Sequence, residues 1–179
     1  YHTVPEKLDI FDSKAFRENP MDFFVVCTDV RTGEPIYHKC RTGDAEDIRW
    51  MQASASMPLA AKIVKIGHYQ LLDGGVADSI PVRFFESIGY KRNLIVLTQP
   101  KGFVKKCGKG NVVMSQLIKS KYPAMEMPLL ARHKLYNNQI QFCEELERRG
   151  KALIFRPSEA LDSFQKNTSE LERYWKMGY

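Results

Sequence analysis

A double glycine between a short strand and a helix is the feature that most constrains the fold of this chain. Residues 69–72 suit a strand, and Asp73-Gly74-Gly75 follows directly. Two glycines in succession indicate a sharp turn or the close approach of another segment, because neither carries a side chain. A helix then opens at Pro81 and ends at Gly89, and residues 93–97 form an apolar strand. This order predicts a βαβ unit, and hence a parallel sheet with helices on its faces.

The preceding residues add two hairpins and a helix to this α/β pattern. The run 23–30 is continuously apolar and β-branched, which favours a strand buried on both faces. Residues 35–40 alternate after a turn and predict a hairpin with this strand. Asp44 is a good N-cap for a helix that Pro58 ends. Residues 62–66 and 69–72 flank a turn at Gly67 and predict a second pair of strands.

The C-terminal part is mainly helical. A helix is expected from about Pro128 to Arg149, where Gly150 stops it, followed by a strand over residues 152–155 and a last helix from about Thr168. At 179 residues the chain has room for one domain with a real core. We therefore expect one domain, in which residues 1–122 form the main part and residues 123–179 a helix-strand-helix continuation.

The composition is that of a folded, water-exposed protein. Hydrophobic residues make up 44% and charged residues 27%, far from the signature of disorder. No apolar run approaches the roughly 18 residues that span a bilayer. The four cysteines, which form no C-x-x-C pair, are Cys27, Cys40, Cys107 and Cys143. We interpret them as reduced thiols, expect a cytoplasmic setting, and predict no metal site and no organic cofactor.

The net charge of +6 is concentrated in one segment. Residues 99–121 carry six lysines and no acid. Such a basic patch can contact an anionic membrane or nucleic acid, which gives an alternative function as a non-catalytic binding module. Phe103 is the only aromatic residue between Gln99 and Lys121, whereas nucleic-acid sites usually interleave several. We therefore expect no nucleic-acid partner and favour a solvated loop.

The motif that indicates a function combines two stretches. Residues 53–58 read Ala-Ser-Ala-Ser-Met-Pro, and residues 72–81 place Asp73-Gly74-Gly75 ahead of Pro81. In spacing and order these stretches closely resemble the second half of the patatin-like phospholipases, in which a helix ending in A-S-x-x-x-P precedes a short hairpin and an Asp-Gly-Gly turn. The resemblance covers most of the chain, although only residues 53–81 are motif-specific. It implies a three-layer α/β/α fold.

The same resemblance implies a serine acyl hydrolase with a two-residue apparatus. In that family an aspartate accepts the proton of a serine held on a G-x-S-x-G elbow, and Asp73 is in the position of that aspartate. A free carboxylate, with a pKa of about 3.9, is a weak base at neutral pH, so the fold must position or partly desolvate it. Gly74 and Gly75 are the supporting turn, since their missing side chains leave the carboxylate approachable.

The sequence also departs from the family pattern. No two of its glycines are four residues apart, so it contains no G-x-S-x-G elbow, and the glycine-rich oxyanion loop is missing too. We expect the chain to be a C-terminal fragment of the hydrolase, inactive alone, whose partners are a lipid or ester substrate and the missing N-terminal segment. A sheet without its first strand also predicts self-association, and peripheral membrane contact is a further expectation.

Other residues of catalytic type receive local roles. Ser54 and Ser56 lie at a helix end rather than on an elbow, which favours hydrogen bonding or packing. Asp78 is expected to cap the helix that follows. Asp29 ends a strand, yet no spacing assigns it a function. The four histidines share no metal-like spacing and are assigned no catalysis.

Overall fold

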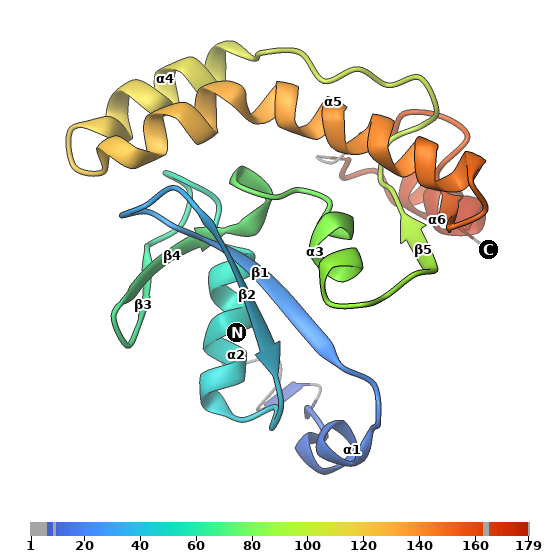
Figure 1. Cartoon of the computed structure of the whole chain (residues 1–179), viewed down its shortest axis with the longest axis horizontal. Coiled ribbons are helices and arrows are strands. Elements are labelled where there is room, and N and C mark those ends of the chain that lie inside the picture. The colour runs from blue at the N-terminus through green and yellow to red at the C-terminus, as the bar shows by residue number, and fades with distance from the viewer. Residues whose placement is uncertain (1–6, 9, 163–164, 179) are drawn as a thin grey trace. The chain divides into compact units, whose positions relative to one another are not determined.

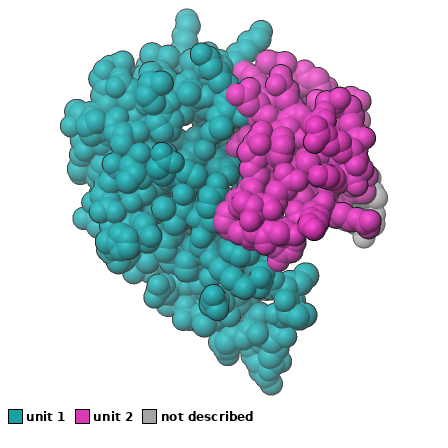
Figure 2. Space-filling model, in the orientation of Figure 1, with its two compact units in different colours: residues 1–81, 106–136 teal, residues 82–105, 137–179 magenta. Residues whose placement is uncertain are grey.

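The computed structural model describes residues 7–8, 10–162 and 165–178, which form two compact units (Figures 1 and 2). The first unit holds the described residues up to Pro81 together with residues 106–136. The second unit holds residues 82–105 and the described residues from Asn137 onward.

The first unit is built on a four-stranded sheet with the strand order β2-β1-β4-β3. Its strands are β1 (Phe23–Asp29), β2 (Pro35–Cys40), β3 (Val64–Ile66) and β4 (Tyr69–Asp73). The two predicted hairpins, β1–β2 and β3–β4, are confirmed. All three strand pairings are antiparallel, so the prediction of a parallel sheet is wrong here. Adjacent apolar runs reveal burial on both faces but not strand direction, and β4 enters the sheet as one arm of a hairpin.

Helices cover both faces of this sheet. On one face, Trp50 and Ala53 of α2 (Ala45–Ser54) pack with Cys27 and Leu71. On the other, Leu72 packs with residues of α4 (Lys109–Lys119), of the short turn η3 (Pro123–Met125) and of the start of α5 (Glu126–Arg148). Consecutive strand residues point to opposite faces, which is why Leu71 and Leu72 are both fully buried. This unit therefore has helices packed on both faces of its sheet (Figure 1).

Local signals define several helix ends as predicted. The Asp44 carboxylate accepts hydrogen bonds from the backbone N–H groups of Glu46 and Asp47 and so caps α2. A short helix, α1 (Ser13–Glu18), is capped in the same way by Asp12 and was not predicted. None of the helices in the described part of the chain is both long and apolar enough to cross a lipid bilayer.

Helix α4 corrects the interpretation of the basic segment. Residues 99–121 were expected to form a solvated loop, yet Lys109–Lys119 are helical. Gly108 and Gly110 and the absence of acids weakened the local helix signal. The helix forms because Ser115 and Ile118 are buried in the first unit, with Ile118 packed in the same cluster as Leu72. Tertiary packing therefore overrides the local propensity.

The second unit contains a separate two-stranded sheet. Its strands, β5 (Asn93–Val96) and β6 (Ala152–Phe155), pair in parallel with Leu94 opposite Leu153 and Val96 opposite Phe155. The remaining elements of the unit are α3 (Val82–Ser87), the second part of α5 and α6 (Thr168–Gly178). The Arg83 guanidinium lies over the Phe142 ring, 3.5 Å from its centroid, and connects α3 with α5.

Candidate active site

Asp73 is the last residue of β4, and its backbone is fixed on both sides. Its N–H donates to the carbonyl of Ser56 at 2.8 Å, and its carbonyl accepts from the Thr28 hydroxyl at 2.8 Å. The carboxylate Oδ1 accepts the N–H of Gly75 at 2.7 Å. In the described part of the chain this is the only hydrogen bond to the carboxylate, and the side chain is half-buried. The second oxygen, Oδ2, therefore remains able to accept a proton or a hydrogen bond.

The two glycines are needed because other atoms lie close to them, and not because their backbone conformation is unusual. Neither has a positive φ. The first residue of the 3₁₀ turn η2 (Gly74–Val76) lies directly on β1, because a β-carbon on Gly74 would be 2.2 Å from the carbonyl oxygen of Val26. A β-carbon on Gly75 would be 2.9 Å from Oδ1 of Asp73. Gly74 thus lets the turn pack on the sheet, and Gly75 keeps the space beside the carboxylate open.

Three polar side chains brace this turn from other parts of the first unit. The Thr28 hydroxyl, fully buried, also accepts the N–H of Ala77 at 3.2 Å. The carbonyl of Gly75 accepts from the Ser79 hydroxyl at 2.8 Å and from Nε of Arg132 at 2.7 Å. Nη2 of Arg132 borders the same small space beside Gly75 as the carboxylate of Asp73. A positive charge on α5 therefore faces the candidate base.

The other carboxylates near these strands have structural roles. Asp29 closes the β1–β2 turn by accepting from Arg31, whose guanidinium lies 2.9 Å from Oδ2. Although burial opposes it, hydrogen bonding to Arg31 holds the pKa of Asp29 below its ordinary value. Asp78 accepts a 2.5 Å hydrogen bond from the hydroxyl of Tyr37, a partner that the expected capping role did not include. Burial, together with this bond, raises the pKa of Tyr37.

The alternative nucleophiles are not arranged for attack. Ser56 is buried and donates to the carbonyl of Gln52 at 2.7 Å, which confirms its local role. Burial, and secondarily the charge of Asp73, raises the pKa of the Cys27 thiol to about 12. Burial likewise raises the pKa of Cys143 to about 11. Both thiols therefore stay protonated at neutral pH and are poor nucleophiles.

A cluster of metal-ligand type lies at the end of β2. The ligand atoms of His38, Cys40 and Asp47 lie within 4.8 Å of one another. Asp47 Oδ2 already accepts three consecutive backbone N–H groups, those of residues 41–43, each at 2.8 Å, and Oδ1 lies 3.1 Å from His38 Nε2. Burial, and then the charge of Asp47, raises the pKa of Cys40 to about 12, which disfavours a metal-binding thiolate. We therefore assign the cluster to anchoring the β2–α2 loop.

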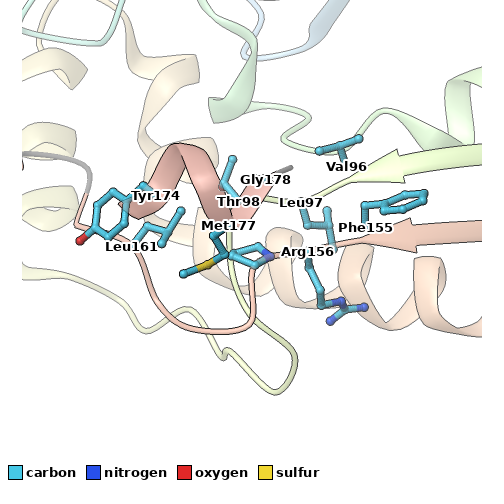
Figure 3. A pocket seen from close by; sticks show the side chains of 10 residues that line it. Val96, Leu97, Thr98, Phe155, Arg156, Leu161, Tyr174, Met177 and Gly178 are labelled. Carbon is cyan, nitrogen blue, oxygen red and sulfur yellow. The ribbon is translucent and has the colours of Figure 1, made fainter. Parts of the chain in front are cut away.

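A pocket of about 300 Å³ lies in the second unit, at the carboxyl ends of β5 and β6 (Figure 3). Figure 3 shows Leu97 and Phe155 on the strand side and Tyr174 and Met177 of α6 on the other. Ligands often bind at such strand ends. No carboxylate or imidazole is among the described residues that line it, and its one cation, Arg156, is paired with Glu144 at 3.2 Å. The pocket therefore offers no catalytic pair.

The fold and the site together define an α/β protein with one candidate base, held on a braced glycine turn at a strand end. Residues 5–85 match the family model of the patatin-like phospholipases. Residues 122–179 match a domain of unknown function (DUF6363). A search of the curated proteins finds no match to the chain. Arg132, in the second matched segment, donates to Gly75 in the first, so the two matched segments meet at the candidate site.

Sequence reasoning identified the turn but missed the residues that hold it. Thr28, Ser79 and Arg132 are separated from their partners by 45, 4 and 57 residues. A Thr near the end of an apolar strand is only weak evidence for a contact with the turn. An Arg inside a long helix gives no such evidence. The His38-Cys40 pair did carry a signal, because side chains two apart on a strand share a face.

Proposed function

We propose that this chain supplies the aspartate of a Ser-Asp dyad to a patatin-like lipid acyl hydrolase, an enzyme that cleaves carboxylic esters, phospholipids among them. The observation that carries the proposal is the half-buried carboxylate of Asp73, fixed by Gly75 through one oxygen and open at the other. The family match of residues 5–85 supports the class of reaction.

In the proposed mechanism, Asp73 acts as a positioned base. Oδ2 accepts the proton of a serine Oγ as that oxygen attacks the ester carbonyl carbon. The proton then passes to the departing alcohol oxygen as the ester C–O bond breaks, which leaves an acyl-serine that water hydrolyses. Neither the base nor the serine requires a metal or an organic cofactor.

The attacking serine and the oxyanion donors come, in this proposal, from a segment outside the printed sequence, which has no G-x-S-x-G elbow. The turn suits such a partner because its own geometry is complete: Thr28, Ser79 and Arg132 hold it independently of a nucleophile. The chain alone is then inactive. Its four cysteines are all free thiols, which supports a reducing, cytoplasmic setting.

The test is Asp73→Asn in the protein that also carries the serine segment. Turnover of a short p-nitrophenyl ester should fall by about 10²–10⁴, because the amide cannot accept the serine proton. Asp22→Asn, which removes a surface carboxylate paired with Lys39, is the control and should keep full activity. Circular dichroism should show both variants folded. Retained hydrolysis in folded Asp73→Asn would exclude the assignment.

A further inference from the structure

A second cavity in the first unit is separate from the Asp73 turn. It is open to solvent, has a volume of about 680 Å³, within the range of small-molecule sites, and lies between the β3–β4 hairpin, the preceding loop and the end of α4. Leu72 lines it, and neighbouring side chains of a strand point to opposite faces. Asp73 is not among the residues that line the cavity.

The cavity has an apolar floor and an apolar mouth. Leu72 and Ile118 are buried at its base, whereas Leu59 and Leu117 are more than half exposed at its edge. Leu59 is also the only non-glycine residue in the described part of the chain with a positive φ, of 64°. That conformation is uncommon for a residue with a side chain, and strained residues of this kind cluster at ligand sites.

The polar lining is cationic. Three lysines, Lys62, Lys65 and Lys121, contribute to it, and no acidic side chain does. Lys65 lies opposite Gln70 in the β3–β4 ladder, and the Gln70 side chain accepts from the Tyr122 hydroxyl at 3.1 Å. This hydrogen bond joins the hairpin to the segment that carries Lys121. The lysines of the lining therefore come both from the side of the hairpin and from the segment after α4.

We propose that this cavity binds a single-chain amphiphile with an anionic head, such as a long-chain carboxylate. The alkyl chain lies on Leu72 and Ile118 between Leu59 and Leu117, and the head is held by the three lysines. A free phosphate or nucleic acid leaves the apolar floor unused, and a neutral lipid leaves three ammonium groups without a counter-charge. The same chemistry is available from a free amphiphile and from a lipid in a bilayer, which the experiment separates.

The measurement is calorimetric titration of this chain with dodecanoate below its micelle concentration. We expect one site, with an affinity that weakens as salt is raised. Octanoate should bind at least about tenfold more weakly, because fewer methylene groups are buried. Dodecanol should also bind at least about tenfold more weakly, because it has no charge for the lysines. Equal binding of dodecanol and dodecanoate would refute the role of the lysines.

Charge reversals locate the site. Lys65→Glu and Lys121→Glu should each weaken dodecanoate binding about tenfold, and Leu117→Ser should weaken it through the lost contact. Lys134→Glu is the matched control, because Lys134 is exposed on α5 and does not line the cavity. All four positions are exposed, and thermal melts check that each variant is folded. An equal loss in Lys134→Glu would mean diffuse charge attraction and would overturn the proposal.

Two further measurements distinguish a free ligand from a membrane lipid, and the cavity from the Asp73 site. Binding only to anionic phospholipid vesicles, with no binding of monomeric dodecanoate, would replace the cavity with a membrane-contact surface and would overturn the proposal. Asp73→Asn should leave the affinity for dodecanoate unchanged, since Asp73 does not line the cavity. The proposal therefore stands or fails independently of the Ser-Asp dyad.

Discussion

At the scale of single residues, the turn of the candidate site follows from the local sequence, whereas the residues that hold the turn follow only from packing. The turn at Asp73-Gly74-Gly75 was predictable, since two glycines after a strand demand a close approach. Its partners were not, because the contacts of Thr28 and Arg132 depend on strand register and on the docking of a distant helix. The two glycines therefore indicate that another segment packs closely on the turn, but the neighbouring residues in the sequence do not reveal which segment it is.

Gly74→Ala tests the close approach of the turn to β1. The new methyl group would meet the backbone of Val26, which cannot rotate away as a side chain would, so the folded chain should lose at least about 2 kcal/mol of unfolding free energy. The matched change is Gly110→Ala in α4, where an added β-carbon has no atom within 4 Å. That variant should be neutral or more stable by about 0.5–1 kcal/mol. Urea unfolding measures both, and equal stability would contradict the packing of the turn.

At the scale of elements, burial was easier to predict than strand direction or partner. The strand positions of β1 to β6 follow from apolar runs, caps and glycines. The βαβ interpretation failed because β4 and β5, on either side of α3, enter two different sheets. A short strand-helix-strand sequence does not distinguish a crossover within one sheet from a passage between two. Helix α4 was missed because its stability comes from buried Ile118 and not from its own residues.

The loop between β2 and α2 depends on one buried carboxylate and should make stability depend on pH. Burial opposes ionisation of Asp47, but hydrogen bonds from the loop backbone and from His38 lower its pKa from 3.8 to about 2. A folded-state pKa below the unfolded value stabilises the chain above about pH 4, and this contribution is lost as the pH falls towards 2. It amounts to about 2 kcal/mol.

Asp47→Asn should therefore be less stable than the parent at pH 7 and should show a shallower fall in unfolding free energy between pH 4.5 and about pH 2.5. Denaturant titrations at each pH, followed by circular dichroism, measure that slope. Glu46→Gln is the control, because Glu46 is exposed in the first turn of the same helix. A parallel pH dependence in Asp47→Asn and the parent would show that another group carries the effect.

At the scale of the whole molecule, the second unit leaves an apolar sheet face open. Leu94, Val96, Leu153 and Phe155 are each more than half exposed, and the β5–β6 register places them on one face. Isolated exposed apolar residues are ordinary, but a contiguous group on one face of a two-stranded sheet is not. This apolar face is therefore the surface through which we expect the self-association predicted from the sequence.

We predict that the chain associates in solution through this face of β5 and β6. Placing lysines at Val96 and Phe155 should shift the mass measured by light scattering towards the monomer, because two adjacent charges cannot be buried against a second apolar surface without a counter-charge. Val104→Lys is the control, since Val104 is exposed outside the sheet and its change should leave the mass unaltered. A parent chain that is monomeric at all concentrations tested would mean that two strands tolerate an open apolar face. Unaltered association of the double variant would instead place the contact elsewhere on the chain.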